Sequence, residues 1–133
     1  MSIVVSYAAT DEGRAALERA VTEARLRGTG LLVVDTSRAP ARVGDGEGPA
    51  GSDLDAAAAS LAGSGVEHEL RPRSGSGDPA DDVVTAASDA GAELIVIGLR
   101  RRTPVGKLIL GSNAQRILLD APGPVLAVKA ETA

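Results

Sequence analysis

The sequence predicts an α/β domain in which a five-stranded parallel sheet lies between two layers of helices. Five short apolar runs, rich in Val, Ile and Leu, alternate with four segments of helical periodicity along the 133 residues. Successive runs begin about thirty residues apart, the spacing of βα units with right-handed crossovers. The core must consist of Val, Leu, Ile and Ala, because the chain has no Trp or Phe and a single Tyr. At this length, residues 1–133 are expected to form one domain.

The first βα unit carries clear start and stop signals. Residues 3–7 begin with Ile-Val-Val and predict a buried strand. Thr10 is placed to cap the following helix, whose first turn holds two acidic residues that suit the positive end of the helix dipole. Gly28 follows the last turn, and residues 31–34 predict the second buried strand. The inner face of the helix is expected to comprise Ala16, Leu17, Ala20, Val21 and Ala24.

The composition changes between residues 36 and 51, where Gly, Pro, Ser, Arg and Asp dominate and Val43 is the one sizeable apolar side chain. We interpret this segment as a surface loop. It is either disordered or a lid over a ligand site, and its low hydrophobicity favours disorder. A second helix is predicted to begin at Ser52 and Asp53. Its inner face is expected to hold Leu54, Ala57, Ala58 and Leu61.

Apolar and polar residues alternate from Val66 to Arg71, unlike in the other apolar runs. This alternation predicts a strand with one exposed face, and therefore a strand near an edge of the sheet. His68, the only histidine, falls on the same face as Val66 and Leu70. Because no second polar residue shares that face, we interpret His68 as a partly covered strand residue rather than a catalytic one.

A glycine-rich segment at residues 75–80 superficially matches the Gly-x-Gly-x-x-Gly/Ala pattern of dinucleotide-binding turns. Asp78 followed by Pro79 is instead a helix start, so a carboxylate would stand where a pyrophosphate must bind. The segment also follows the third strand, whereas the dinucleotide pattern opens the first βα unit. We therefore expect an ordinary helix that ends before Gly91. Its buried face is expected to hold Val83, Val84, Ala87 and Ala90.

The stretch between the fourth strand and the fourth helix has the pattern of a phosphate-binding site. Residues 94–97 predict a strand buried on both faces, Gly98 ends it, and three consecutive arginines follow. After a loop, Gly111 precedes a helix that Ser112 and Gln115 open as a capping box. Helix N-termini bind anions because they present free N–H groups and a partial positive charge.

This stretch is not a P-loop, because Gly106-Lys107 is followed by Leu108 and Arg101 stands where the first glycine belongs. The local charge nevertheless favours an anion. Residues 98–133 hold six basic and two acidic residues, a net charge of +4, whereas the remainder holds eight basic and sixteen acidic residues, a net charge of −8. A chain of net charge −4 is not expected to bind nucleic acid, so a small anionic ligand is the predicted partner.

The last two elements are a helix over residues 112–120 and a fifth strand over residues 124–128. Ile117 and Leu118 are expected to face inward, and Pro122 forbids the helix to continue. The absence of cysteine excludes a disulfide scaffold, a thiolate metal site and a cysteine nucleophile. No metal is expected, no apolar run could span a membrane, and no signal peptide is recognisable, so we expect a cytoplasmic protein.

The glycine spacing resembles the Gly-x2-Gly-x9-Gly-Ser signature of the universal stress protein family. Gly98, Gly111 and Ser112 stand at that spacing, Arg101 replaces the second glycine, and residues 113–129 are similar to the family's C-terminal sequence. The resemblance covers nearly the whole chain. It implies a Rossmann-like domain with the strand order 3-2-1-4-5. It also implies a ligand site between the turn after strand 1 and the Gly98–Ser112 loop.

The resemblance implies a stress-response protein, and ATP-binding members usually carry an aspartate in the turn after strand 1. Here that turn is Ala8-Ala9-Thr10. Weak binding of ATP or another nucleotide is the favoured function, and a nucleotide-independent dimeric interaction protein is the alternative. An enzyme is not expected, because the predicted site offers no evident base or metal ligand. The predicted ligand-binding residues are Gly98, Arg100, Arg101, Gly111, Ser112 and Asn113. The predicted homodimer forms through strand 5, at Val125, Leu126, Ala127 and Val128.

Overall fold

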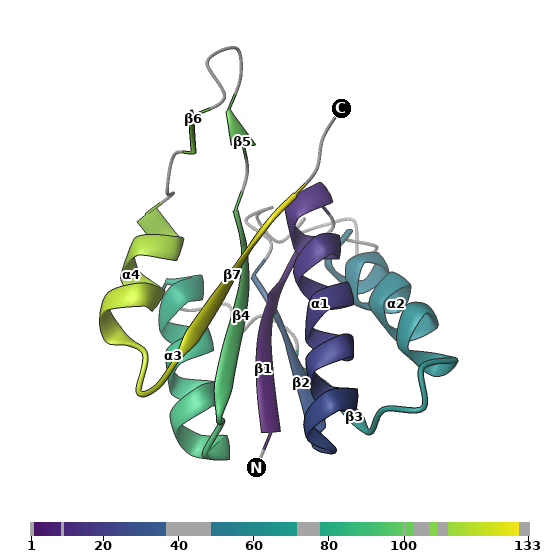
Figure 1. Ribbon diagram of the computed structural model, residues 1–133. Helices are drawn as coiled ribbons and strands as arrows, with labels where there is room; N and C mark the ends of the chain where they lie inside the picture. Colours follow the sequence, from purple (N-terminus) through teal and green to yellow (C-terminus); the bar gives the residue numbers. More distant parts are fainter. Residues whose placement is uncertain are drawn as a thin grey trace.

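The computed structural model describes residues 2–8, 10–36, 49–71, 78–99, 101–102, 107–108 and 112–130, and a parallel sheet flanked by helices forms its body (Figure 1). Five strands form this sheet in the order β3-β2-β1-β4-β7, and every neighbouring pair is parallel. The order is 3-2-1-4-5 with β7 as the fifth strand, so the predicted fold class is confirmed. In chain order the elements are β1 (Ser2–Tyr7), α1 (Asp11–Arg27), β2 (Gly30–Asp35), α2 (Pro49–Ala62), β3 (His68–Arg71), α3 (Pro79–Ala90), β4 (Leu94–Leu99), β5 (Arg101–Arg102), β6 (Lys107–Leu108), α4 (Ser112–Asp120) and β7 (Val125–Lys129).

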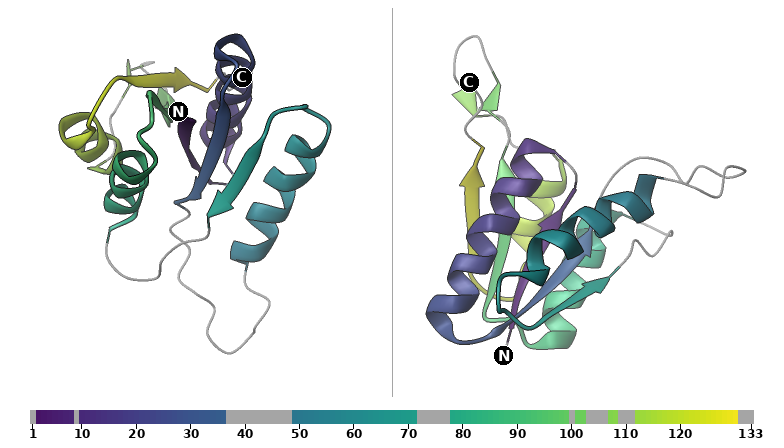
Figure 2. Two further views of the ribbon diagram at one scale, coloured as in Figure 1. Left: turned by 90° about the horizontal axis from the view of Figure 1, so that it is seen from below. Right: turned by 90° about the vertical axis from the view of Figure 1, so that its right-hand side faces the viewer.

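The sheet has a hydrophobic core on each face. Helices α1 and α2 cover one face, and α3 and α4 cover the other (Figure 2). Alternate residues of β1 enter opposite cores, with Val5 and Tyr7 in the first and Val4 in the second. The central strands are therefore buried on both sides, as their continuous apolar runs predict. Helix α1 contacts the core beneath it largely through alanines, whose small side chains allow the helix to lie close to the sheet.

The helix ends follow the predicted capping signals. The Thr10 hydroxyl accepts a hydrogen bond from an amide in the first turn of α1 at 3.0 Å. The Asp78 carboxylate accepts a hydrogen bond from the Ala80 amide at the start of α3, at 3.2 Å. Gly28 and Gly91 end α1 and α3 with φ angles of 64° and 60°, a conformation that favours glycine. The interpretation of Asp78-Pro79 as a helix start is thus confirmed, while residues 75–77 lie outside the described residues.

The buried faces of two helices differ in part from prediction. In α3, Ala86 is buried and Ala90 is exposed. In α4, Ile117 is buried, whereas its neighbour Leu118 is 41% exposed. The contact of α4 is narrow and buries only one of these two neighbours, because successive helical residues point about 100° apart.

The second helix and the third strand each begin at a different residue from the one predicted. α2 begins at Pro49 rather than Ser52, because proline is well tolerated at the first helical position. Residues 37–48 of the predicted loop lie outside the described residues. His68 opens the edge strand β3 and is exposed rather than partly covered, and its Nδ1 lies 2.9 Å from the Val66 carbonyl oxygen.

A short hairpin follows β4 where the sequence predicts only a loop. Its strands, β5 and β6, pair antiparallel, with Arg101 opposite Leu108 and Arg102 opposite Lys107. The hairpin projects beyond the carboxyl ends of the main strands (Figure 1). Strands of two residues are too short to produce a recognisable alternation, which is why sequence periodicity does not reveal them.

Candidate functional site

The candidate site lies where the chain changes its direction of winding, between the adjacent strands β1 and β4. The register of these strands pairs Val4 with Ile95 and Val5 with Val96. From the carboxyl end of β1 the chain passes to α1 on one face, and from β4 it passes through the hairpin to α4 on the other (Figure 1). In open α/β sheets such a switch point forms a crevice beyond the strand ends, where ligands bind.

The first turn of α1 lies directly against the backbone of its neighbours at two glycines. A Cβ on Gly98 would lie 2.6 Å from the backbone carbonyl carbon of Glu12. A Cβ on Gly13 would lie 2.8 Å from the amide nitrogen of Ala8. Both positions therefore need glycine, because backbone atoms cannot yield as a flexible side chain does. The lack of a side chain at Gly98 allows α1 to pack closely against β4. The strand continues through Leu99 instead of ending at the glycine as predicted.

Hydroxyl groups tie the carboxyl ends of β1 and β2 together. The Thr36 amide donates to the Tyr7 carbonyl oxygen at 2.8 Å, and Thr36 Oγ1 donates to the same oxygen at 3.1 Å. Ser6 Oγ lies 3.0 Å from Thr36 Oγ1. Because Thr36 has already used its one hydroxyl proton, Ser6 is the donor in this pair. These residues are not among those predicted from the sequence, although a hydroxyl residue beside the end of an apolar run is the signal that was available.

Asp35, the last residue of β2, lies opposite Tyr7 in the parallel register. Its side chain has 0% exposure. Asp35 interacts with another group of the protein, but its carboxylate oxygen Oδ2 accepts no hydrogen bond among the described residues. Ser6 and Thr36 are both partly exposed, so a ligand at this edge meets their hydroxyls before the Asp35 carboxylate.

A single arginine anchors α4 beside α3. The Arg116 guanidinium forms ion pairs with Asp78 at 3.3 Å, Asp81 at 3.2 Å and Asp120 at 3.6 Å. Asp78 is also the cap of α3, so these contacts link the body of α4 to the start of α3. Each pair is solvent-exposed and contributes little stability alone, but together they fix the position of α4 at this edge.

The predicted ligand-binding residues are described to different extents. Gly98 lies in β4, and Asn113 is half-buried in the first turn of α4. Arg101 belongs to β5, and Ser112 is the first residue of α4 rather than the residue before the helix. For these two, the structure describes the backbone alone. Two of the six lie outside the described residues, namely Arg100 and Gly111.

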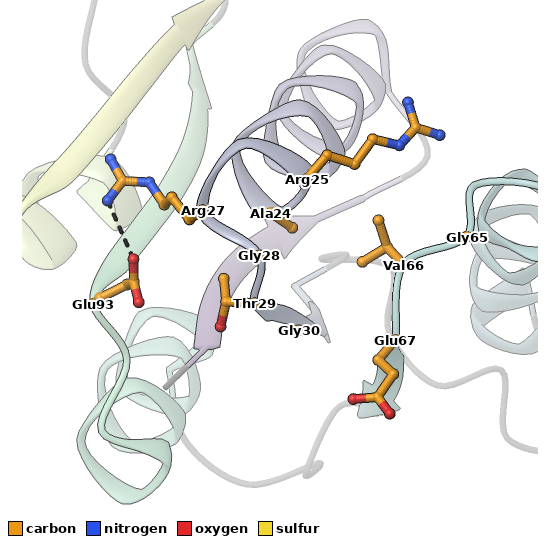
Figure 3. A pocket seen from close by; sticks show the side chains of 10 residues that line it. All are labelled: Ala24, Arg25, Arg27, Gly28, Thr29, Gly30, Gly65, Val66, Glu67 and Glu93. Carbon is orange, nitrogen blue, oxygen red and sulfur yellow. Dashed lines mark hydrogen bonds and ion pairs between the residues drawn. The ribbon is translucent and has the colours of Figure 1, made fainter.

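A groove lies at the opposite, amino-terminal edge of the sheet (Figure 3). It has a volume of about 810 Å³ and is lined by the last turn of α1, the turn into β2 and the segment before β3. On one side Arg27 Nη1 contacts Glu93 Oε2 at 3.2 Å. Hydrogen bonds with Glu93 and Glu23 raise the pKa of Arg27 above its ordinary value, so this guanidinium stays charged. The groove mixes both charges and does not coincide with the predicted anion site.

The polar groups described at the carboxyl edge include the Ser6 and Thr36 hydroxyls and the Asn113 carboxamide. Within the described ranges, no group of three or more His, Asp or Glu side chains is arranged to share a metal ion. No helix in that part of the chain combines the length and the apolar character that crossing a membrane requires.

Comparison with known proteins agrees with this architecture. A family model described as the universal stress protein family matches residues 1–129. The chain belongs to the universal stress protein family. A universal stress protein from Mycolicibacterium smegmatis is 47% identical over 127 residues, which cover 96% of each chain. The family suggested by the spacing of Gly98, Gly111 and Ser112 is thereby confirmed.

Solved structures of universal stress proteins share the fold. One from Archaeoglobus fulgidus is 38% identical, covers 97% of this chain and 98% of that chain, and superposes with a TM-score of 0.78. A second from Archaeoglobus fulgidus, solved in complex with dAMP, is 33% identical with the same coverage and a TM-score of 0.73. The universal stress protein fold that the sequence resemblance implied is therefore the one observed.

Proposed function

We propose that this universal stress protein is a regulatory module that binds ATP or a related adenine nucleotide weakly at the carboxyl edge of its sheet. The phosphates contact the segment from β4 to the start of α4, and the nucleoside extends over the ends of β1 and β2. The module has no catalytic activity of its own and requires no metal. The residues assigned to the phosphates are Gly98, Arg100, Arg101, Gly111, Ser112 and Asn113.

The position and charge of α4 support this proposal most strongly. α4 begins on the far side of the switch point from α1, and its first turn carries no acidic residue. The first turns of α1 and α3 each carry two acidic residues, which interact favourably with the positive ends of those helices. The first turn of α4 carries no such acid, so an external anion is the group that would interact favourably with the positive end of this helix. The net charge of +4 over residues 98–133 acts in the same direction.

The complex of an Archaeoglobus fulgidus relative with dAMP supports an adenine nucleotide as the class of ligand. Two features of this chain modify the expectation. The turn after β1 carries Ala8 and no carboxylate before Asp11, so the nucleoside has fewer strong acceptors to contact. Three arginines follow Leu99, and guanidinium groups bind phosphate in a bidentate way. We therefore expect the phosphates to contribute more to affinity than the base.

Gly111→Val is expected to abolish nucleotide binding, because a β-branched side chain would crowd the backbone that the phosphate must approach. Calorimetric titration with ATP, ADP and AMP measures the effect. Gly123→Val is the matched control, since a Cβ at Gly123 would have no atom within 4 Å. Unchanged ATP affinity in Gly111→Val would contradict the assigned phosphate site, and no heat from the unmutated protein would contradict nucleotide binding altogether.

We also propose that the protein is a homodimer through β7. This strand lies at the edge of the sheet and is apolar over Val125, Leu126, Ala127 and Val128. Nearby on α4, Leu119 is 83% exposed and Leu118 is 41% exposed. An uncharged open edge favours aggregation, so soluble proteins usually cover it. A second copy covers it most simply, by pairing the two β7 strands antiparallel about a two-fold axis.

A nucleotide-independent interaction protein is the second candidate function. It is favoured by Arg101 at the second glycine position of the family signature and by Ala8 in the turn after β1. The exposed leucines of α4 would then serve assembly alone. The two candidates differ in a simple measurement, because only the first predicts heat or a thermal shift on addition of ATP, ADP or AMP.

A further inference from the structure

The groove at the amino-terminal edge of the sheet is separate from the proposed nucleotide site, which lies beyond the opposite ends of the strands (Figure 3). Its volume of about 810 Å³ falls within the range of about 300–1,000 Å³ that is usual for ligand sites. The walls come from segments far apart in the sequence, because the end of α1, the segment before β3 and Glu93 all line it. Nucleotide binding at the carboxyl edge leaves this groove without a role.

Two glycines expose the backbone of the groove to a ligand. Gly28 and Gly65 have φ angles of 64° and 77°, and a Cβ at either position would meet no atom within 4 Å. Among the described residues, the Gly28 carbonyl oxygen and the Gly65 amide form no hydrogen bond. Each residue of a polypeptide carries one backbone acceptor, and each except proline also carries a backbone donor. An extended peptide can therefore come close to the groove at these two glycines and supply the missing partners.

Two charges at the groove have no opposite charge paired with them among the described residues. Arg25 donates from Nε and Nη2 to the Ser64 carbonyl oxygen at 3.2 and 2.7 Å, so no carboxylate neutralises it. These bonds use two of the five donors of a guanidinium and leave three. Within the same part of the chain, the exposed Glu67 forms no ion pair. Arg27 and Glu93, by contrast, already pair with each other at 3.2 Å.

The directions of the two unpaired side chains favour a peptide over a smaller ligand. The side chains of Arg25 and Glu67 point away from each other, on opposite sides of Val66 (Figure 3). A free amino acid carries its ammonium and carboxylate on one carbon atom, which suits two charges that point toward each other. Charges that point apart suit acidic and basic side chains at different positions of an extended peptide. Val66 is partly exposed between them and offers an apolar contact to the intervening residues.

We propose that this groove is an interaction surface for an extended peptide segment of a partner protein. A basic side chain of the segment pairs with Glu67, an acidic side chain pairs with Arg25, and the backbone between them lies over Gly28 and Gly65. The groove and the proposed nucleotide site are at opposite edges of the sheet, so one molecule can bind both ligands at once. The interaction goes beyond the proposed function and does not depend on it.

The test titrates synthetic peptides into the ¹⁵N-labelled full chain. In these peptides Lys and Asp flank a spacer of two to five alanines, in both orders, and both termini are blocked. At least one peptide is expected to shift the amide resonances of the groove residues in ¹H–¹⁵N correlation spectra. Glu67→Gln and Arg25→Gln are each expected to weaken its binding about two- to fivefold, the range for one exposed ion pair.

Two further variants separate charge from other effects. Arg25→Lys retains the positive charge and is expected to bind the peptide more tightly than Arg25→Gln does. Glu18→Gln is the matched control and is expected to bind like the unmutated protein. It removes an exposed carboxylate from the middle of α1, outside the residues that line the groove.

Several outcomes would overturn the proposal. One is that no peptide of the series shifts these resonances at millimolar concentration, or that the shifts lie outside the groove. Another is equal binding of peptides that carry Gln and Asn in place of Lys and Asp. A mixture of free lysine and aspartate that reproduces the shifts would show that the site takes small molecules instead. Self-association that Glu67→Gln abolishes would identify a second copy of this chain as the occupant. The ATP titration tests the nucleotide proposal separately, so failure here leaves that proposal intact.

Discussion

Gly98→Ala is expected to lower the free energy of unfolding by about 3 kcal/mol. The added Cβ would lie 2.6 Å from the backbone carbonyl carbon of Glu12. The first turn of α1 cannot shift easily, because Gly13 of the same turn lies equally close to Ala8. Relief of the clash therefore requires α1 to move away from β1 and β4, which opens the core beneath it. Urea unfolding followed by far-UV circular dichroism measures the change.

Gly123→Ala is the matched control for this prediction. A Cβ at Gly123 meets no atom within 4 Å, and its φ is not positive, so the substitution should change stability by less than about 0.5 kcal/mol. Equal unfolding midpoints for the two variants would contradict the close packing of α1 on β4. A large loss of stability in Gly98→Ala alone would show that this glycine of the family signature is required for packing.

Ala127→Pro is expected to convert the proposed dimer into a folded monomer. Ile95 donates its amide to the Pro124 carbonyl oxygen, and Ala130 donates to the Leu99 carbonyl oxygen, at 3.1 and 3.2 Å. In a parallel ladder the amides alternate in direction, so the amide of Ala127 faces the open edge. Proline at this position removes an edge donor and leaves the β4–β7 hydrogen bonds in place. Light scattering at micromolar concentration measures the mass.

Aspartate substitutions in β7 test the same interface less cleanly. Leu126→Asp or Val128→Asp should disrupt the dimer, but both side chains also pack partly against the core beneath α1. A charge there destabilises the protomer as well, by several kcal/mol if it stays ionised, and insolubility is a further expected outcome. Leu26→Asp is the control, since Leu26 is 75% exposed on α1 and should leave the dimer intact. A monomeric mass for the unmutated protein would contradict the interface.

Features that depend on near neighbours in the chain are predictable from the sequence. The Thr10 cap, the Asp78-Pro79 helix start and the glycine at the end of α1 each require only a few adjacent residues. The buried strands are predictable for the same reason, because a continuous apolar run needs no partner to be recognised. The strand order came from family resemblance, since alternation of strands and helices is compatible with several orders.

Features that join distant residues were not predictable. The contact of Gly98 with Glu12 joins the fourth strand to the first helix, whereas the sequence pattern predicts a strand end at this glycine. The Ser6–Thr36 pair spans 30 residues, and the Arg116–Asp78 pair spans 38. A polar residue has many possible partners at such separations, and only the fold selects one. The six ligand-binding residues therefore remain predictions from the signature.

The position of Tyr7 makes the protein its own optical reporter. It is the only aromatic residue in the chain, and its side chain is 2% exposed at the end of β1. Near-ultraviolet circular dichroism and intrinsic fluorescence therefore come from one chromophore, without a tryptophan background. The ring lies in the core under α1, while the Tyr7 carbonyl accepts both hydrogen bonds from Thr36. A single spectral band can thus follow displacement of α1, ligand arrival at the strand ends and global unfolding in an unlabelled sample.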